Sequence, residues 1–328
     1  MTEYPPRLSL VAGPTPLMLL DRLSRDVGGP RIWVKRDDLT GCATSGNKVR
    51  KLEFTLAAAL EHGCDTVITC GGVQSNHCRT TAILSAQLGL QCHLLLRGKE
   101  EAADGNLLLD RLANAAITFY PEAEYRAREP TLFDEWIDYY HSRDRKAFCI
   151  PVGASDGIGV WGYIRACEEL ARDFTSHGIS PGAIISATGS GGTQAGLTVG
   201  SQLFGLNTDV YGINVCDNEQ YFLDKVADDI SQWQQWYRQA LGPENVSINV
   251  IDGYVGPGYA RATPAVFDTI KLAAQLHGLI LDPVYSGKAM HGLIDQIRQG
   301  RFDHCDDVVF VHTGGLFGLF PQRDQLHW

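Results

Sequence analysis

The stretch Ser45-Gly46-Asn47-Lys48-Val49-Arg50-Lys51-Leu52-Glu53 sets a lysine directly after a small, turn-forming tripeptide. The residues that follow predict a helix that begins at this lysine. The amine of Lys48 is then held where the chain reverses and points at one spot. Because a lysine at a helix start is most often a solvated surface charge, the stretch indicates a function only together with a second feature.

That second feature is the loop Thr188-Gly189-Ser190-Gly191-Gly192-Thr193, which follows the apolar run Ala183-Ile184-Ile185. The order strand, glycine-rich loop and helix places backbone N–H groups where they can bind a phosphate, although many such loops are only tight turns. A positioned lysine and one phosphate site together suggest pyridoxal 5′-phosphate (PLP), which requires a Schiff-base lysine and an anion site for its single phosphate.

The chain has 328 residues, which suit two lobes better than one small core. Its 44% apolar and 20% charged residues are typical of a soluble globular protein. No apolar run approaches the ~20 residues of a membrane span, and the N-terminus lacks the basic and apolar regions of a signal peptide. We therefore expect a cytoplasmic protein without a membrane partner.

The nine cysteines are scattered and form no C-x-x-C pair. We interpret them as reduced thiols, since neither a disulfide framework nor a metal site has this spacing. The net charge is −10 and there is no basic tract, which argues against a nucleic-acid partner.

Short β-like runs alternate with amphipathic helical stretches along most of the chain. The expected strands are 67–69, 92–96, 117–120, 148–150, 183–186, 210–215, 247–251, 279–281 and 308–311. The expected helices are approximately 76–88, 106–115, 163–174, 194–204, 264–277 and 288–299. This alternation predicts an α/β protein with mainly parallel sheets that helices cover on both faces.

Glycine-rich or polar clusters follow several of the expected strands, at 71–76, 188–193, 285–287 and 312–315. Ligands of parallel sheets bind at the carboxyl ends of the strands. We expect the four clusters to meet at one rim, which is a stronger indication of a site than any one of them.

With these residues, the chain resembles the 1-aminocyclopropane-1-carboxylate (ACC) deaminase/D-cysteine desulfhydrase family. Its members are PLP-dependent enzymes of fold type II, related in architecture to the tryptophan synthase β subunit. The resemblance runs nearly end to end, through GPTPL (13–17), WVKRDD (33–38), SGNKVRKLE (45–53), GVQSNH (72–77), PVGAS (151–155), GSGGT (189–193), LDPVYSGK (281–288) and HTGG (312–315).

The resemblance implies two three-layer α/β lobes. The large PLP-binding domain would comprise residues 1–52 and 158–328. The small inserted α/β domain would comprise residues 53–157 and close over a small amino-acid substrate. The resemblance also implies a homodimer.

By the same resemblance, Lys48 would carry PLP as a Schiff base and then remove the Cα proton of the substrate. That role requires a neutral amine, and hence a pKa depressed by burial or by nearby positive charge. Lys51, one helical turn on, is the rival by residue type, but only Lys48 occupies the family's position.

Four consecutive residues would bind the cofactor ring and the substrate. Asn76 would hydrogen-bond the ring hydroxyl of PLP; the alternative is that it caps the following helix, and both roles could hold together. Ser75 would bind the substrate carboxylate or handle a proton; the alternative is a plain turn serine, and no His–Asp partner indicates a protease-like triad. Gln74 and His77 would flank the substrate, with a structural role as the alternative for His77.

The phosphate would be held by the backbone N–H groups of Gly189, Ser190, Gly191, Gly192 and Thr193 and by the two hydroxyls among them. The loop is not G-x-x-x-x-G-K-[ST], which argues against a nucleoside triphosphate. Tyr259 and Tyr285 match tyrosines near the substrate in the family. Each lies in a glycine-rich loop, which favours a site role over a place in the core, and a phenol could protonate a leaving group.

Ser286 and Thr313 bear on the reaction type, because the partner of the pyridine nitrogen sets how strongly PLP withdraws electrons. A carboxylate partner keeps that nitrogen protonated, whereas a hydroxyl favours prompt loss of a β leaving group. ACC deaminases carry glutamate directly after the tyrosine, where this chain has Ser286. The departure points to β-elimination, and the favoured hypothesis is conversion of D-cysteine to pyruvate, ammonia and hydrogen sulfide.

Other activities stay open at this point. Within the family they are ACC deamination, L-cysteate sulfo-lyase, D-amino-acid ammonia-lyase and racemase activity. A non-catalytic PLP-carrying protein is a hypothesis of another class, against which Lys48, Ser75 and Tyr285 argue. A nicotinamide dehydrogenase is disfavoured because no G-x-G-x-x-G with a following acidic residue is evident.

Overall fold

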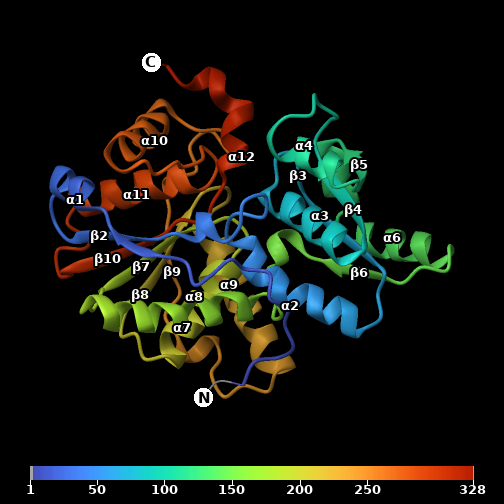
Figure 1. Ribbon diagram of the computed structural model, residues 1–328, viewed down its shortest axis with the longest axis horizontal. Helices are drawn as coiled ribbons and strands as arrows, with labels where there is room; N and C mark the ends of the chain where they lie inside the picture. The colour runs from blue at the N-terminus through green and yellow to red at the C-terminus, as the bar shows by residue number, and fades with distance from the viewer. Residues whose placement is uncertain (1–2, 328) are drawn as a thin grey trace.

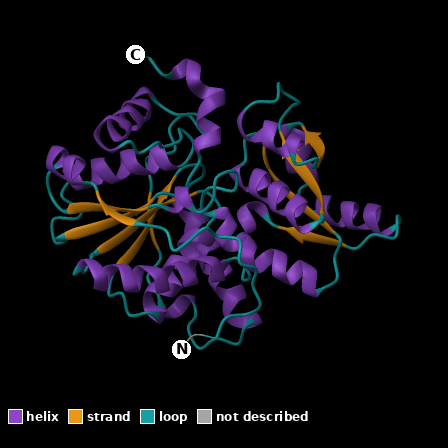
Figure 2. Cartoon of the chain, viewed as in Figure 1, coloured by secondary structure: helices purple, strands orange, loops and turns teal. Residues whose placement is uncertain are grey.

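Two β-sheets, each between layers of helices, organise residues 3–327, which the computed structural model describes (Figure 1, Figure 2). The larger sheet has six strands in the order β1-β2-β10-β7-β8-β9, and the smaller has four in the order β5-β4-β3-β6. Every strand pair is parallel except β1 with β2. The predicted fold, two α/β lobes with mainly parallel sheets, is confirmed.

The larger sheet joins the two ends of the chain. Its strands are β1 (Leu17–Leu19), β2 (Arg31–Lys35), β7 (Ala183–Thr188), β8 (Asp209–Asn214), β9 (Asn249–Ile251) and β10 (Asp307–Val311). Strand β10 lies between β2 and β7, with Val309 opposite Trp33 on one side and Ile184 on the other. Every residue of β7 and β10 is buried, as expected for strands covered on both faces.

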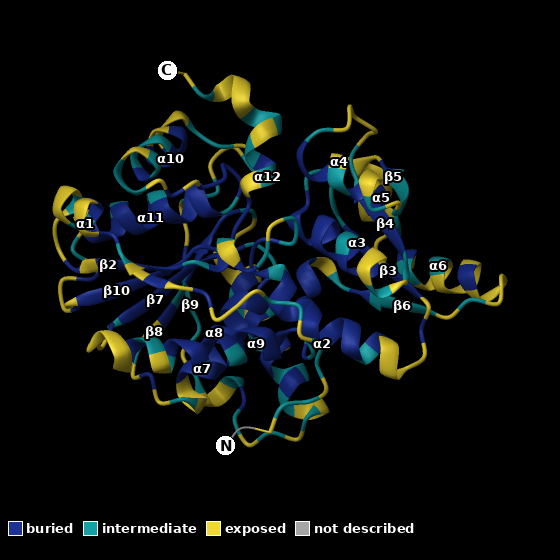
Figure 3. Ribbon diagram, in the orientation of Figure 1, coloured by how far each residue is buried: buried dark blue, intermediate teal, exposed yellow. Residues whose placement is uncertain are grey.

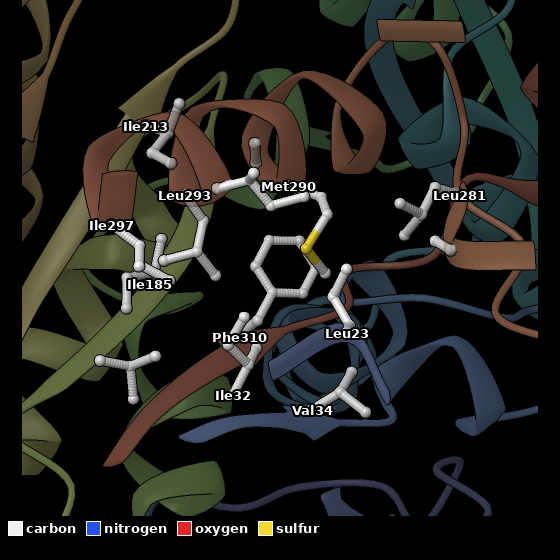
Figure 4. Close-up of a cluster of buried hydrophobic side chains, with 14 of the residues drawn as sticks. Leu23, Ile32, Val34, Ile185, Ile213, Leu281, Met290, Leu293, Ile297 and Phe310 are labelled. Carbon is white, nitrogen blue, oxygen red and sulfur yellow. The ribbon is translucent and has the colours of Figure 1, made fainter. Parts of the chain in front are cut away.

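Helices of the large lobe cover both faces of this sheet. One layer contains α1 (Asp21–Val27), α10 (Pro264–His277) and α11 (Ser286–Arg298), followed by the short α12 (Leu316–Leu319). Its apolar core packs Leu23 of α1 and Met290 of α11 against Phe310 of β10 (Figure 4). The other layer contains α7 (Val160–His177), α8 (Gly192–Leu203) and α9 (Glu219–Trp236).

The small lobe repeats this layering around β3 (Thr66–Gly72), β4 (Gln91–Arg97), β5 (Ala116–Tyr120) and β6 (Ala147–Ile150). One face packs on α3 (Asn76–Leu88) and α4 (Gly105–Leu112), and the other on α5 (Glu122–Arg128) and α6 (Leu132–His141). Figure 3 shows the buried strands of both lobes and the exposed outer sides of the helices. Short 3-10 segments occur at η1 (Asp37–Leu39), η2 (Val152–Ala154), η3 (Pro243–Asn245) and η4 (Phe320–Gln325).

Helix α2 (Lys48–Glu61) lies between the lobes (Figure 1). Its Leu52 and Leu56 pack in the core of the small lobe, whereas Phe54 packs with Trp161 of the large lobe. The division predicted between residues 52 and 53 therefore falls inside one helix. The domain boundaries stay a prediction.

A buried ionic cluster fixes the first turn of α2. The Arg50 guanidinium donates to both carboxylate oxygens of Asp37 at 2.8 Å and to both of Glu169 at 2.9 Å, and Tyr163 also donates to Asp37. Burial alone raises the pKa of Asp37, but Arg50 outweighs it and lowers that pKa below its usual value. Because Arg50 is two residues from Lys48, the cluster anchors the backbone that carries this lysine.

Several elements differ from the sequence expectations: strands β1 and β2 and helices α1, α5 and α6 were not expected. Two further differences have a clear physical reason. The strand expected at 279–281 is wrong: Leu279 and Leu281 are buried in the core, but the carbonyl of Ile280 bonds the His312 ring instead of a neighbouring strand. The 18-residue helix α9 was not expected, although its buried residues Phe222, Val226, Ile230 and Trp233 have helical spacing. Two more observations concern the helices and the cysteines of residues 3–327. None of these helices is long and apolar enough to cross a membrane. The nine cysteines are free.

Candidate active site

A cavity of about 1090 Å³ lies where the strand ends of both lobes meet. All four predicted clusters contribute to its lining: residues 71–76 after β3, residues 188–191 and Thr193 after β7, Tyr285, and Thr313 after β10. Segments distant in sequence thus converge at one rim, as parallel sheets require.

Lys48 is the first residue of α2 and lines the cavity. Burial lowers the pKa of its amine from 10.5 to about 8, so a substantial share of the amine is neutral at mildly alkaline pH. Lys51 is fully buried outside the lining residues and donates to Ser155 Oγ at 3.1 Å. Of the two lysines, the structure brings Lys48 to the cavity and places Lys51 behind its wall.

The glycine loop leads into the N-terminus of α8, where the helix dipole favours an anion. The Gly192 N–H, predicted to bind the phosphate, instead donates to Ser155 Oγ at 3.2 Å, and Gly192 does not line the cavity. The Ser155 hydroxyl, which accepts from Lys51 and from the Gly192 N–H, donates to Ser190 Oγ at 2.8 Å. Ser190 therefore accepts one hydrogen bond and keeps its own proton to donate.

Thr193, at the end of the loop, also accepts one hydrogen bond and keeps its own proton to donate. Its Oγ1 accepts from Asn47 Nδ2 at 2.9 Å, so its hydroxyl proton is free. Both loop hydroxyls are thus arranged as donors, which is the arrangement a phosphate group requires.

Ser75 and Asn76 have different roles at the start of α3. Ser75 is the N-cap, because its Oγ accepts from the Cys78 N–H at 3.2 Å. The alternative that Asn76 caps this helix is therefore wrong. The buried Oδ1 of Asn76 has no hydrogen-bond partner among residues 3–327, and the residue lines the cavity.

Gln74 and His77 also line the cavity, but much of their hydrogen-bonding capacity is used elsewhere. The Gln74 amide donates to the Asp104 carbonyl at 3.1 Å and accepts from the Asn106 N–H at 2.9 Å. His77 Nε2 lies 2.7 Å from Thr69 Oγ1. Burial and the positive charges of both site lysines hold the pKa of His77 well below its usual value, so the ring is neutral.

The two tyrosines meet directly. The hydroxyls of Tyr259 and Tyr285 lie 2.6 Å apart, and both residues line the cavity. Burial raises the pKa of Tyr259 to about 12 and raises that of Tyr285 well above its usual value. Both phenols are therefore protonated at neutral pH and can act as proton donors.

Ser286 and Thr313 are placed differently. Thr313 lines the cavity, but Ser286 is fully buried outside the lining residues. Its hydroxyl donates to Asp282 Oδ1 at 2.6 Å and accepts from the Asp282 N–H at 2.9 Å. One lone pair of Ser286 Oγ is left for a further partner.

Sequence reasoning missed several contributors to the site. Gly153 has φ +69°, and a Cβ there would lie 2.3 Å from Ser190 Oγ and 3.0 Å from Lys48 Nζ. Ser155 bridges Lys51 and the glycine loop. Both lie in the segment PVGAS after β6, whose glycine and serine after a strand were an available signal.

These observations fit PLP. The lysine, the loop with its free hydroxyl donors and the unpartnered Asn76 oxygen would supply the covalent, phosphate and ring contacts that PLP requires. Only a residue without Cβ fits between Lys48 and Ser190. With its two-lobed α/β fold, the site defines a PLP-dependent enzyme.

Comparison with known proteins agrees. The family described as "Pyridoxal-phosphate dependent enzyme" matches residues 8–314, and the chain belongs to this family. A putative ACC deaminase of Thermotoga maritima is 41% identical over 98% of this chain and 99% of its own length. A D-cysteine desulfhydrase of Klebsiella pneumoniae is 39% identical over 99% and 98%. A bifunctional D-cysteine desulfhydrase/ACC deaminase of Arabidopsis thaliana is 40% identical over 91% and 75%.

Solved structures show the same relationship. The crystal structure of an ACC deaminase homologue superposes with a TM-score of 0.88 at 36% identity, over 98% of this chain and 95% of that one. A fungal L-serine ammonia-lyase from Rhizomucor miehei, with a TM-score of 0.70 at 16% identity over 97% of this chain and 98% of its own, shares the fold. The resemblance to the ACC deaminase/D-cysteine desulfhydrase family is confirmed, and with it the PLP dependence and the enzymatic class.

Proposed function

We propose that the protein is a carbon–sulfur lyase that converts D-cysteine and water to pyruvate, ammonia and hydrogen sulfide. The family supports an amino-acid substrate, since its relatives carry the names D-cysteine desulfhydrase and ACC deaminase. The choice between these activities depends on the surroundings of Ser286.

Ser286 is the observation that carries the proposal. Its side chain is fully buried, and its hydroxyl and N–H both bond Asp282 Oδ1, at 2.6 and 2.8 Å. A glutamate in its place would set a second carboxylate beside that of Asp282 in a buried position, where like charges are costly. The site is built for a hydroxyl, which supports β-elimination over the ring opening for which ACC deaminases carry glutamate.

The chemistry that PLP supplies when bound is withdrawal of electrons from Cα of the amino acid. Lys48 would hold the cofactor and, once released by the substrate, take the Cα proton on its Nζ, for which its lowered pKa suits it. The free O–H of Ser75 would donate to the substrate carboxylate. Thr313 and the Asn76 amide would contact the cofactor ring.

The Tyr259–Tyr285 pair would supply the proton that the leaving sulfur takes. One phenol donates to the other across 2.6 Å, so the second phenol keeps its proton for the leaving group. Because both pKa values are raised, neither phenol is ionised at neutral pH. Gln74 and His77 would shape the wall beside the substrate rather than bind it through charge.

A panel of D-cysteine, L-cysteine, ACC, L-cysteate and D-serine tests the proposal, with sulfide, sulfite, ammonia, 2-oxo acid and optical rotation as readouts. We expect D-cysteine to give sulfide, pyruvate and ammonia in equal amounts. Lys48→Ala should abolish both this turnover and the visible absorbance of bound PLP, whereas Lys271→Met, remote from the cavity, should retain both. Absence of sulfide and pyruvate from D-cysteine would contradict the proposal.

ACC deamination is the second candidate, favoured by the names of the Thermotoga and Arabidopsis relatives. It predicts 2-oxobutanoate and ammonia from ACC. Sulfite from L-cysteate, ammonia from D-serine or a change of optical rotation would identify the other activities.

A homodimer and a cytoplasmic location belong to the proposal as well. Light scattering during size-exclusion chromatography should give twice the 35.9 kDa of one chain. A mass equal to one chain would contradict the dimer.

A further inference from the structure

Lys288, on α11, is 1% exposed and has no carboxylate within ion-pair distance among residues 3–327. Its ammonium group donates instead to three backbone carbonyls: Val255 at 2.6 Å, Gly258 at 2.9 Å and Val215 at 3.2 Å. An ammonium has three N–H donors, so these three acceptors use all of them.

Each carbonyl belongs to a segment of the cavity wall. Val215 directly precedes Cys216, and Gly258 directly precedes Tyr259; both of these neighbours line the cavity. Lys288 itself is three residues beyond Tyr285, one helical turn along α11. One side chain thus ties the end of β8, the loop of residues 252–263 and the start of α11 at a single point.

The start of the loop of residues 252–263 is fixed by side chains: Asp252 accepts from Asn214 Nδ2 at 2.9 Å, and the Tyr254 hydroxyl bonds Asp295 and Gln296 of α11 at 2.6 and 2.7 Å. Beyond Tyr254 the fixed points are fewer. Gly256 and Gly258 both have positive φ, and only one isolated bridge, from Gly258 to Arg261, joins the loop to itself. Glycine-rich backbone is conformationally permissive, so its position depends on external anchors. Lys288 binds two carbonyls of this loop and is such an anchor.

The position of Tyr259 depends on this loop. The Tyr259 hydroxyl meets that of Tyr285 at 2.6 Å, and its ring lies under the Arg97 guanidinium of the small lobe at 5.7 Å. A Cβ at Gly72 would lie only 3.1 Å from this ring. Tyr259 is therefore held in contact with both lobes, and a small loop displacement would break its contact with Tyr285.

We propose that Lys288 is a positioning residue that holds the Tyr259 hydroxyl on Tyr285 by tying the carbonyls of Val255 and Gly258 to α11. The effect on turnover rests on the proposed role of the tyrosine pair in proton transfer. The effect on the loop does not. A side chain without N–H donors cannot replace the ammonium, because the carbonyls of Val215 and Val255 would lose this donor in a buried or partly buried position.

The first test measures how well the backbone of residues 252–263 is held in place. Lys288→Met is compared with Lys271→Met, a matched change at a lysine of α10 that pairs with Asp268 on the outer side of the lobe. In the PLP-loaded proteins, we expect faster amide hydrogen exchange in residues 252–263 for Lys288→Met alone, by about 10-fold or more. Equal exchange in the two variants would overturn the proposal whatever the substrate is.

The second test measures coupling to Tyr259 on whichever panel substrate the protein consumes. Lys288→Met should lower kcat roughly 10- to 100-fold with KM changed less than about threefold, since a general acid contributes to the chemical step. In a Tyr259→Phe background, Lys288→Met should lower kcat less than about threefold, because the Tyr259 hydroxyl that Lys288 positions is absent. Equal fold losses in the two backgrounds would overturn the proposal.

The third test is rescue. Lys288→Ala leaves three carbonyls at the end of a space of propylammonium size, so added ethylammonium or propylammonium should restore kcat at least about fivefold, whereas tetramethylammonium, which has no N–H, should not. Equal restoration by all three ions, or by none, would overturn the proposal. Lys288→Leu, which also lacks an N–H donor, replaces Lys288→Met if the latter does not fold, and the same comparisons then apply.

Discussion

Asn47 Nδ2 donates a 2.9 Å hydrogen bond to Thr193 Oγ1 across 146 residues of sequence. The residue before Lys48 and the last residue of the glycine loop are thus in direct contact. Because Asn47 occupies a lone pair of the threonine hydroxyl, the hydroxyl proton points elsewhere and can bind an anion. The residues proposed to make the covalent and the phosphate contacts of the cofactor are thus positioned by the same hydrogen bond.

Asn47→Ala should weaken retention of PLP while Lys48 still captures it. The lost hydrogen bond is worth about 1 kcal/mol, or roughly a 5- to 10-fold rise in Kd. Titration of the cofactor-free protein, followed by visible absorbance, measures this. Asn245→Ala, at an exposed turn far from the loop, is the control and should bind PLP as the wild type does. Equal Kd values for the two variants would show that the contact does not help to hold the phosphate.

Gly153→Ala should abolish PLP binding through a local clash. A methyl group there meets Ser190 Oγ at 2.3 Å and Lys48 Nζ at 3.0 Å. Gly178→Ala is the matched control, since its φ of +63° resembles the +69° of Gly153 but nothing lies within 4 Å. Both changes carry a backbone strain of about 1 kcal/mol. We expect a loss of Tm in both variants, larger in Gly153→Ala because of the clash, and loss of bound PLP in Gly153→Ala alone. Retained binding in that variant would contradict the fit.

The capture of PLP by Lys48 should depend on pH with a midpoint near 8. Burial lowers the pKa of this amine from 10.5 to about 8, and only the neutral amine attacks an aldehyde. The rate of capture by the cofactor-free protein should therefore rise with pH through about 8 and level off roughly one pH unit higher. Borohydride reduction fixes the bound PLP to the lysine that carries it, and peptide mapping should find this adduct on Lys48 and leave Lys51 unmodified. A rate that still rises steeply at pH 10 would indicate an unperturbed lysine.

Asp37→Asn should destabilise the protein by roughly 3 kcal/mol at neutral pH, because it removes a carboxylate partner of the buried Arg50. Despite burial, Arg50 lowers the pKa values of Asp37 and Glu169 in the folded state. Their contribution to stability is therefore present above the unfolded pKa values, 3.8 and 4.5, and is lost as pH falls through the lower folded values.

Urea unfolding at several pH values measures this contribution. The difference in unfolding free energy between the wild type and Asp37→Asn should shrink below about pH 4. Asp138→Asn, at an exposed position on α6, should show no such difference. A gap that is constant with pH would assign the effect of Asp37→Asn to packing rather than charge.

Local sequence signals were sufficient to predict many of the helices and strands. The expected bounds of α3 and α10 agree with the structure, since Gly89 and Gly278 in the left-handed region end these helices and Pro264 begins the second. The expectation at 279–281 failed because an apolar run states that side chains are buried but not whether the backbone finds a neighbouring strand. Helix α9 was missed because polar residues separate its apolar stripe.

In the candidate site, too, some features could be predicted from the sequence and others could not. Lys48, the glycine loop and the four clusters were predictable, because each combines a residue type with a local turn that limits what it can do. The bonding state of Gln74, the Asp282 partner of Ser286 and the Tyr259–Tyr285 contact were not predictable. Each depends on partners that the local sequence does not specify.

The sequence by itself determined the α/β class, the family and the cofactor, because periodicity, turn residues and ordered motifs are properties of neighbouring residues. Only the tertiary structure decided which hydroxyls keep a proton to donate, which lysine faces the cavity and which carbonyls surround Lys288. Those properties depend on distances between segments that packing brings together, and hydrogen bonding and burial change steeply over an ångström.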